Sequence, residues 1–514
     1  MSSNRIIGKA GGLLLAAILA LGLAHLLLLP PFEGFDETGH YSSILQIADT
    51  GDIPRLGTAW MAREVEAYQT QGPMPYSASG LTYKPFFQGD PTPRGMMPSP
   101  PFQASGLANW QGQHPPLYYL LLTPLAKATV NLPLRQRLYW LRAMSFLLAF
   151  GGLCLAVIQY ARQTGNDGWH AALWPLLMPS WFPEMARLGN DSLACLLLAL
   201  AWGAMLTLRQ RLDHGRTWLL LGFWLGLGLL TKAYIWPIAL AAFGYLAILA
   251  WRGNARLLVW PATAFALMLA IGAPWYLWLA ANGIATTNDA AMLAQQGGLL
   301  AGLAKHWSWH DFLYSLGSLG KSFIWAGTWS FARPAEIFYL PYLAFCLLLL
   351  VGWLRANRQR PAALLPPLVF LLPMLLGLIG QSLLWLALGE KGVTGGWYLH
   401  VLVGPLSLIL ASALAELQQG NSGRILCKTM LAYALAFGAG LAWLQTALYS
   451  GCASVMPNSP VYSVDWSCTA NGLLLWRRLS MLAEPGLATI AAMLGTSLLA
   501  GSLFARRLPS IRLN

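Results

Sequence analysis

The sequence predicts an all-α polytopic membrane protein, on three observations. Hydrophobic residues make up 56% of the 514 residues and charged residues only 10%, which is too apolar for a soluble protein with a wet surface. Apolar runs near the ~20 residues that cross a bilayer recur from residues 6–29 to residues 486–504. Basic residues punctuate the ends of alternate runs, as topology signals do.

About twelve membrane-spanning helices are expected from these apolar runs. The first run lacks a small-residue cleavage site, so we expect it to remain in the mature protein and not to be removed as a signal peptide. The expected spans cover residues 6–29, 140–160, 169–183, 193–208, 218–230, 235–251, 257–280, 338–354, 364–388, 398–417, 425–449 and 486–504.

The distribution of charge predicts how these spans are oriented. With both termini in the cytoplasm, the inner segments hold half of all Lys and Arg residues but only three acids, Asp167, Asp213 and Glu416. This positive-inside pattern accounts for the net charge of +13 without a nucleic-acid partner. We therefore expect a multi-pass protein of the bacterial inner (cytoplasmic) membrane, surrounded by membrane lipid, with both termini in the cytoplasm and its chemistry on the periplasmic face.

The first external loop, residues 30–139, contains Pro-rich and Gly-rich stretches that cannot hold a continuous helix. Two shorter apolar patterns, at residues 39–49 and 117–128, predict juxtamembrane helices that lie along the membrane surface.

Two further external loops are expected later in the chain. Residues 282–333 are rich in Trp, whose indole ring suits the membrane interface. Residues 450–485 contain Cys452 and Cys468, and an oxidising compartment would favour a disulfide between them.

The strongest local signal for chemistry is FEGFDETGHY, directly after the first span, which places Asp36, Glu37 and His40 between two hydrophobic elements. In a partly dry cavity, repulsion between the adjacent carboxylates and their desolvation would raise one proton affinity, as a general base requires. The alternative is that both are solvated loop carboxylates that stabilise the start of the next helix.

Three basic residues, Arg142, Arg187 and Lys232, fall at outer ends of apolar runs, where the positive-inside tendency disfavours them. Together they could bind an anionic lipid phosphate, the arginines by a two-pronged fork and the lysine as a point charge. The alternative for Lys232 is that it extends to the lipid headgroups. The outward histidines lack a metal-binding pattern such as HExxH, so no metal or cofactor is expected.

These motifs, taken in order, resemble the GT-C superfamily of membrane glycosyltransferases, which use polyprenyl-phosphate or dolichyl-phosphate sugars. FDETGHY is similar to the Asp-Glu motif of the protein O-mannosyltransferases and aminoarabinose transferases. GQHPPLYYLL resembles their second juxtamembrane helix, LRAMSFLLAFGGLCLAV their Arg-led second span, and RLGNDSLA and GLGLLTKAY their later outer turns. The likeness implies a GT-C-like catalytic module at residues 1–280 and a variable transmembrane module at residues 281–514.

Carried over residue by residue, the resemblance implies Asp36 as the catalytic base, with Glu37 beside it orienting the acceptor or organising the site. Arg142 and Lys232 would hold the donor phosphate, and the charge pattern adds Arg187 to them. The second half departs from the family where GGWYLHVLVGPL has Trp397 in place of an Arg, so His400 or Lys391 becomes a candidate for that contact. Residues expected to shape the site are His40, His114, Asn190, Asp191 and His400.

The sequence thus favours an enzyme that moves a sugar from a polyprenyl-phosphate donor to an acceptor hydroxyl, with inversion implied by the superfamily. The acceptor, whether a glycan, a lipid or a protein, stays open, as does the sugar. A transporter or flippase of a lipid-linked glycan is the alternative, although transporters place polar groups at mid-membrane and show inverted repeats, which are not evident here. A scaffold that binds lipid donors without catalysis is a third possibility.

Overall fold

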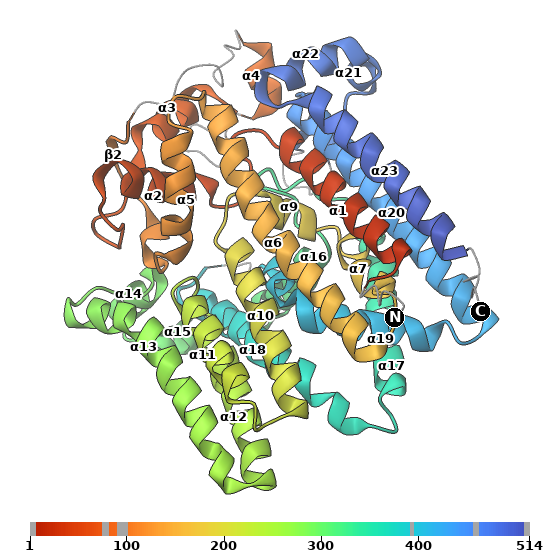
Figure 1. Cartoon of the computed structure of the whole chain (residues 1–514). Helices are drawn as coiled ribbons and strands as arrows, with labels where there is room; N and C mark the ends of the chain where they lie inside the picture. Colours follow the sequence, from red (N-terminus) through yellow and green to blue (C-terminus); the bar gives the residue numbers. More distant parts are fainter. Residues whose placement is uncertain (1–6, 74–81, 90–100, 391–394, 456–461, 508–514) are drawn as a thin grey trace.

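The chain is almost entirely helical, with long helices running side by side and shorter ones gathered at their ends (Figure 1). The described part also contains two small antiparallel strand pairs, β1 (Trp60–Ala62) with β2 (Ala104–Ala108) and β3 (Ala453–Val455) with β4 (Tyr462–Val464). The predicted all-α polytopic fold is confirmed. The structure, a computed structural model, describes residues 7–73, 82–89, 101–390, 395–455 and 462–507.

Ten helices within these ranges are long and apolar enough to cross a membrane. Three of them continue from a short 3-10 turn, namely η3 (Ala255–Leu258), η4 (Glu336–Tyr339) and η6 (Gly396–Leu402). The ten are α1 (Lys9–Leu28), α6 (Leu134–Thr164), α10 (Asp191–Gln210), α12 (Ile235–Gly253), α13 (Val259–Ala281), α17 (Leu340–Ala356), α18 (Leu365–Ala387), α19 (Val403–Leu417), α20 (Asn421–Tyr449) and α23 (Pro485–Arg507).

One expected span, residues 169–183, is broken into three short helices. Pro175, Pro179 and Pro183 each lack the backbone N–H that an uninterrupted helix needs, so the segment turns at short intervals. These turns bring polar residues of the following segment into the bundle. The three helices are α7 (Trp169–Ala172), α8 (Trp174–Leu177) and α9 (Trp181–Ala186).

A second expected span, residues 218–230, lies in α11 (Gly215–Leu229). This helix has 15 residues and is therefore about 22 Å long, less than the ~30 Å of a hydrocarbon core. It still runs between α10 and α12 and packs against both, and against α13. The described chain thus holds ten candidate spans where about twelve were expected, and the other ten predictions are confirmed.

Both predicted juxtamembrane helices of the first loop are present. They are α2 (Glu37–Thr50) and α5 (Leu117–Ala128), which pack on each other through buried residues such as Ile44 and Leu122. The loop also contains α3 (Arg63–Gln71), α4 (Tyr83–Gln88) and η2 (Trp110–Gln113). The result is a small folded cap at one end of the long helices (Figure 1).

The two later external loops are also folded. Cys452 and Cys468 form the disulfide that the sequence predicts. The Trp-rich loop contains α14 (Asn288–Gln295), α15 (Leu299–His306) and α16 (Trp309–Ile324), and the disulfide-bonded loop leads into α21 (Trp466–Ala470) and α22 (Gly472–Leu482). One further turn, η5 (Pro361–Ala363), precedes α18.

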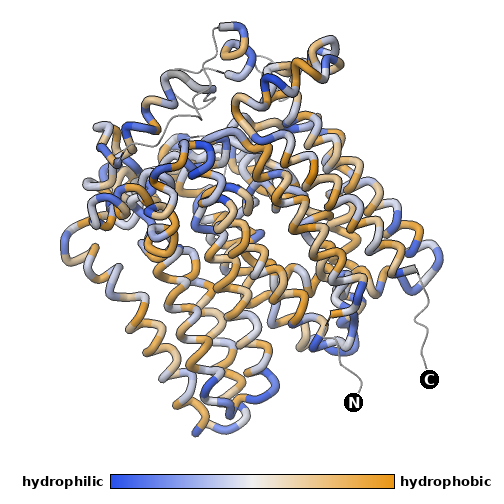
Figure 2. Tube along the Cα trace, turned by 45° about the horizontal axis from the view of Figure 1, so that its top comes forward, coloured by the Kyte–Doolittle hydropathy of each residue, from blue (hydrophilic) through white to orange (hydrophobic). Residues whose placement is uncertain are grey.

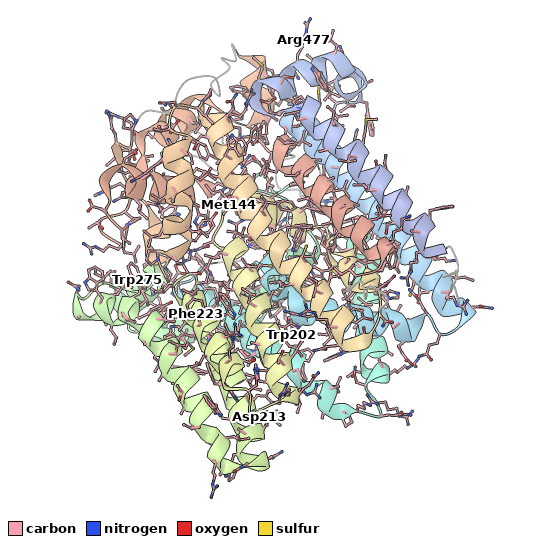
Figure 3. The ribbon with its side chains drawn as sticks, viewed as in Figure 1. Met144, Trp202, Asp213, Phe223, Trp275 and Arg477 are labelled. Carbon is pink, nitrogen blue, oxygen red and sulfur yellow. A yellow bond between two sulfur atoms is a disulfide. The ribbon has the colours of Figure 1, made fainter. Side chains whose placement is uncertain are left out.

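The first and last spans, α1 and α23, pack along each other. The start of α1 and the end of α23 lie together at the end of the bundle opposite the cap. Gly8 donates to the Asp167 carbonyl at 3.3 Å, and Arg506 Nη1 lies 3.8 Å from the Asp167 carboxylate. Hydrophobic residues line the middle of the long helices and hydrophilic ones gather at the two ends (Figure 2). Charged side chains such as Asp213 and Arg477 mark opposite ends (Figure 3). The fold therefore separates two polar faces by an apolar belt.

Candidate active site

Asp36 lies where the chain turns from α1 into α2. Its backbone is left-handed, with φ 61° and ψ 7°, a conformation that Asp and Asn tolerate better than most residues. Its carbonyl accepts hydrogen bonds from the N–H groups of Gly39 and His40 at 3.0 and 3.1 Å, which start α2. The side chain is half-buried. The turn thus fixes the backbone from which this carboxylate extends.

Glu37, the next residue, is fully buried in an ion pair. Nε and Nη2 of Arg142 donate to its two carboxylate oxygens at 2.7 and 2.6 Å, and both side chains are 0% exposed. The backbone N–H groups of Gly34 and Leu188 donate to the same carboxylate at 3.1 and 2.8 Å. Both oxygens of the Glu37 carboxylate are therefore held by partners within the protein, which suits a residue that organises the site.

Arg142 also holds the end of the first span. Nη1 donates to the Leu29 carbonyl at 2.6 Å and Nη2 to the Pro30 carbonyl at 2.7 Å. With Nε, Nη1 and Nη2 all donating within the protein, this side chain does not face open space. The predicted phosphate contact by Arg142 is therefore not favoured, because a buried guanidinium that is already paired would have to release Glu37 to bind a ligand.

A second buried cluster joins two outer turns of the bundle, at residues 184–191 and 232–234. Arg187 Nε donates to Glu184 at 3.0 Å, and its Nη2 pairs with Glu184 and, at 3.0 Å, with Asp191 Oδ2. Lys232 Nζ lies 3.4 Å from the same Asp191 oxygen, and the Tyr234 hydroxyl donates to the other at 2.8 Å. Lys232 is 5% exposed. Its side chain does not extend to solvent, so the alternative in which Lys232 reaches the lipid headgroups is not supported.

The charges of this cluster act on the Asp36 carboxylate. Arg187 Nη1 donates at 2.9 Å to the carbonyl of Phe35, the residue directly before Asp36. Burial raises the pKa of Asp36, whereas the Arg187 and Lys232 cations favour its carboxylate and the Asp191 carboxylate opposes it. A carboxylate with a raised proton affinity, held beside two cations, has the properties of a general base next to an anion site.

Gly34 allows this turn to dock onto the cluster. A Cβ at residue 34 would lie 2.6 Å from the Arg187 Cβ and 2.6 Å from the Glu37 carboxyl carbon. No side chain fits between these two groups. The glycine within FEGFDETGHY is thus explained by close packing, since its backbone has no unusual φ.

Three of the polar residues predicted to shape the site lie next to it. His40 Nδ1 is 3.0 Å from the Tyr119 hydroxyl, and the rings of His40 and His114 stack with centroids 6.1 Å apart. Burial lowers the pKa of both histidines, and the Arg187 and Lys232 cations lower it further, so both rings are held neutral. Asn190 Nδ2 donates to the Thr231 carbonyl at 3.4 Å, linking two of the outer turns.

His400 is placed differently from the expectation. Its Nε2 donates to the Phe323 carbonyl at 3.0 Å and its ring stacks on Phe323, with centroids 5.1 Å apart. These contacts hold His400 against α16. Neighbouring residues of η6 reach the site instead, because Tyr398 lies 5.3 Å from Lys232 Nζ and Trp397 stacks on Phe35 at 4.6 Å. The other candidate, Lys391, lies outside the described residues.

The sequence analysis did not single out Glu33, although it stands in the same motif. This fully buried carboxylate accepts hydrogen bonds from the hydroxyls of Tyr83 and Thr328, both at 2.6 Å, and from the Ser330 N–H at 2.9 Å. It connects the turn before Asp36 to the Trp-rich loop and to α4. The signal that could have found it is its place in FEGFDETGHY, as the first of three acids and four residues after the apolar run that ends at residue 29.

Fold and site together define a polytopic membrane protein with a buried, charged cluster at one end of its spans. Residues 113–278 match the family described as dolichyl-phosphate-mannose-protein mannosyltransferase. Over these residues, about a third of the chain, the match agrees with the predicted resemblance to the GT-C membrane glycosyltransferases. The matched range contains Arg142, Arg187, Asp191 and Lys232, and it begins after Asp36.

Two solved structures align with most of the chain. The crystal structure of ArnT from Cupriavidus metallidurans bound to undecaprenyl phosphate has 15% sequence identity and a TM-score of 0.49, over 97% of this chain and 79% of that chain. The apo structure of the same protein has 13% identity and a TM-score of 0.49, over 96% and 77% of the two chains. No curated protein matches the sequence.

Proposed function

We propose that this protein transfers a sugar from a polyprenyl-phosphate donor to an acceptor hydroxyl, with inversion at the sugar and with Asp36 as general base. One observation carries the proposal. Asp36 and Lys232 lie almost two hundred residues apart in the sequence, yet the charges of Lys232 and Arg187 both act on the Asp36 carboxylate, and Arg187 holds the Phe35 carbonyl directly before it. The undecaprenyl phosphate bound to ArnT agrees with a donor of this chemistry.

The reaction follows from these positions. The acceptor oxygen attacks the anomeric carbon of the sugar, the bond from that carbon to the phosphate oxygen breaks, and the acceptor proton passes to the Asp36 carboxylate. Polyprenyl phosphate leaves with the electron pair of the broken bond. Lys232 would stabilise the charge that develops on this phosphate, in a region from which water is largely excluded. These fixed cations supply the charge without a divalent metal.

The remaining predicted residues are given positioning roles. Glu37 and Arg142 hold the turn that carries Asp36, and Arg187 holds the carbonyl next to it, so we assign the phosphate contact chiefly to Lys232. His40, His114 and Asn190 form the surrounding wall. The module at residues 1–280 thus provides the charged groups, and the module at residues 281–514 adds aromatic side chains from η6.

We propose that the site faces the periplasm and that both termini are cytoplasmic, in a bacterial inner membrane. The start of α1 and the end of α23 lie together at the end of the bundle opposite the cap (Figure 1). That end collects the basic loops, which is the positive-inside pattern. The disulfide between Cys452 and Cys468 lies towards the other end, where an oxidising compartment would form it.

The direct test incubates the purified protein with a panel of radiolabelled polyprenyl-phosphate sugars and extracted envelope glycolipids. We expect one donor to lose its label to an acceptor, with turnover unchanged by EDTA. Loss of activity on chelation would overturn the metal-free mechanism. Movement of intact donor across a vesicle membrane, with no transfer of sugar, would instead identify a flippase.

Replacement of Lys232 by Met is expected to weaken donor binding and slow transfer by about ten- to a hundredfold, since one charge-assisted contact to phosphate contributes about 1.5–3 kcal/mol. Met keeps the aliphatic part of the side chain and removes the ammonium, which lies 5.3 Å from the centre of the Tyr398 ring. The measurement is the Kd for a polyprenyl phosphate, with exposed Lys127→Met as the control. An unchanged Kd in Lys232→Met would remove this residue from the phosphate site.

The pH dependence of transfer should report the raised pKa of Asp36. A general base acts in its carboxylate form, so kcat/KM is expected to fall as the pH falls through that pKa, at a higher pH than an ordinary Asp near ~4 would give. In Lys232→Met one cation that favours the carboxylate is lost, so the acidic limb should move to higher pH. A pH profile identical in both proteins would contradict the coupling of these two residues.

A further inference from the structure

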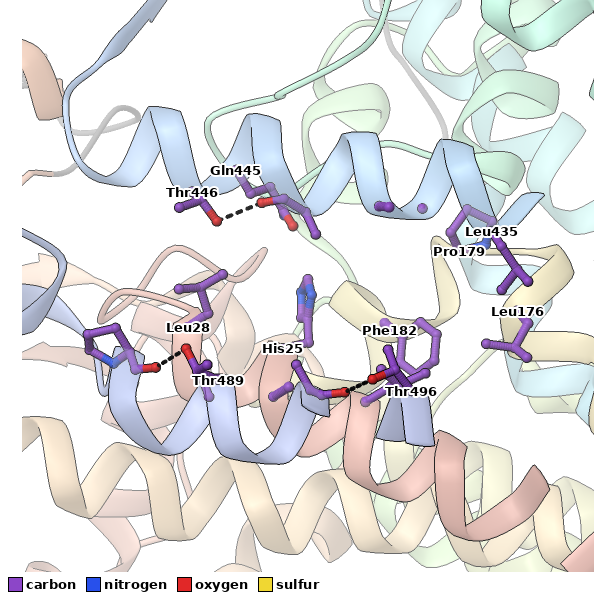
Figure 4. Close-up of a pocket in the computed structure, with 18 of the residues that line it drawn as sticks. His25, Leu28, Leu176, Pro179, Phe182, Leu435, Gln445, Thr446, Thr489 and Thr496 are labelled. Carbon is purple, nitrogen blue, oxygen red and sulfur yellow. Dashed lines mark hydrogen bonds between the residues drawn. The ribbon is translucent and has the colours of Figure 1, made fainter. Parts of the chain in front are cut away.

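An apolar cavity of about 810 Å³ lies between α1, α20 and α23 (Figure 4). Its walls are formed by side chains such as Leu28, Leu176, Phe182 and Leu435, and the charged residues of the proposed active site are not among those that line it. The volume is in the range of small-molecule binding sites, ~300–1,000 Å³. A cavity with these walls, inside the membrane belt, is suited to a hydrocarbon chain.

The cavity is long enough to hold the hydrocarbon chain of a lipid from one leaflet. The lining residues on α23 run from Pro485 to Leu499, a rise of about 21 Å along the helix axis, and those on α20 run from Ala434 to Thr446, about 18 Å. One leaflet of a bilayer contributes about half of the ~30 Å hydrocarbon core. At the end nearest the cap, the lining includes Trp476 of α22, and Trp is typical of the membrane interface.

His25 is the one ionisable side chain among the described residues that line the cavity, and its ring extends into the space between α1 and α20 (Figure 4). Its Nε2 is buried and has no hydrogen-bond partner in the described structure. The hydroxyls of Thr446, Thr489 and Thr496 differ, because each already donates to a backbone carbonyl at 2.7–3.0 Å. A buried polar atom of this kind needs a partner, which the ligand would supply.

We infer that this cavity binds the acyl chain of an outer-leaflet lipid whose ester, amide or hydroxyl group hydrogen-bonds to His25. An isoprenoid chain has no polar group below its phosphate and would leave His25 unpaired, so the donor is not the favoured occupant. The lining residue Phe182 lies two residues before Glu184 of the charged cluster. Resting on the proposed function, this proximity makes the lipid a candidate for the sugar acceptor.

The test uses full-length protein in lipid vesicles that contain a phospholipid with a photoreactive group on its acyl chain. Gly438 lines the cavity and Gly440 does not, and a Cβ added at either would meet nothing within 4 Å. Gly438→Trp is expected to reduce labelling of the lining residues at least tenfold, whereas Gly440→Trp on the same helix is expected to leave it unchanged. Equal labelling in both variants would overturn the inference.

Two further experiments distinguish an acyl lipid from polyprenyl phosphate as the occupant of the cavity. His25→Leu should lower labelling by the ester lipid several-fold and leave labelling by a photoreactive alkane unchanged. A photoreactive polyprenyl phosphate that labels the same residues, and loses that labelling in Gly438→Trp, would overturn the assignment to an acyl lipid. Labelling needs no sugar donor, so it fails or succeeds independently of transfer activity.

The acceptor role has its own test in Gly438→Trp. For an acceptor site, this variant is expected to have a raised KM for the lipid acceptor and an unchanged Kd for the donor. An unchanged KM would overturn that role.

Discussion

Replacing Asp36 with Asn is expected to reduce sugar transfer by about 10²–10⁴-fold, because a general base contributes that much to the rate. The substitution preserves the shape of the side chain, and it removes the negative charge and the ability to accept a proton. Asn also tolerates the left-handed backbone at this position, φ 61°, so the turn into α2 should form normally. Donor binding is expected to persist, since Lys232 keeps its partner Asp191. The measurements are kcat/KM for transfer and the Kd for polyprenyl phosphate.

The matched control is Asp52→Asn, which changes an exposed carboxylate just beyond the other end of α2. We expect this variant to transfer sugar at the normal rate. Asp36→Ala is a second useful variant, because added small carboxylates such as formate should partly restore its activity if residue 36 supplies a base. Full activity in Asp36→Asn would exclude the proposed mechanism, whatever the donor Kd.

The elements that the sequence predicted well are those specified by local signals. The helix expected at residues 39–49 became α2 (Glu37–Thr50), which Gly51 ends with a left-handed φ of 78°. The helix expected at residues 117–128 is α5, with the same bounds. Asp36, Arg187 and Lys232 were singled out because charge beside an apolar run is costly, and that cost does not depend on the rest of the fold.

What the sequence could not show is which charges are partners. Arg142 and Glu37 are separated by 105 positions, and nothing in either motif indicates that one neutralises the other. Arg142 was therefore assigned to the donor phosphate on its position alone. Its four acceptors come from residues 29, 30 and 37, which depend on how α1 and α6 cross.

The assignment of His400 failed for a related reason. In a 3-10 helix the side chains at i and i+3 point the same way, so Trp397 and His400 lie on one face of η6, one turn or ~6 Å apart. Trp397 stacks on Phe35 beside the site, whereas His400, one turn further along, contacts Phe323. Sequence alone fixes neither the type of helix nor its rotation.

Breaking the ion pair between Glu37 and Arg142 is expected to have the largest effect on stability. Glu37→Gln leaves a buried guanidinium without its counter-charge, and loss of one partner of a buried pair typically costs about 3–5 kcal/mol. Arg142→Met leaves the carboxylate unpaired instead. The thermal unfolding midpoint of the purified protein in detergent should fall in both. The control is Glu336→Gln, which breaks the exposed pair with Lys321 and should cost about 1 kcal/mol or less.

The double variant Glu37→Gln/Arg142→Met distinguishes the two roles that Arg142 could have. Removing both charges leaves neither one buried alone, so the double variant should lose much less stability than the sum of the single variants. If Arg142 only holds the turn, the double variant should bind polyprenyl phosphate with a nearly unchanged Kd. If Arg142 contacts the phosphate, that Kd should rise tenfold or more even though folding is restored. Because Arg142 donates to Glu37 and to two backbone carbonyls, we expect the first result.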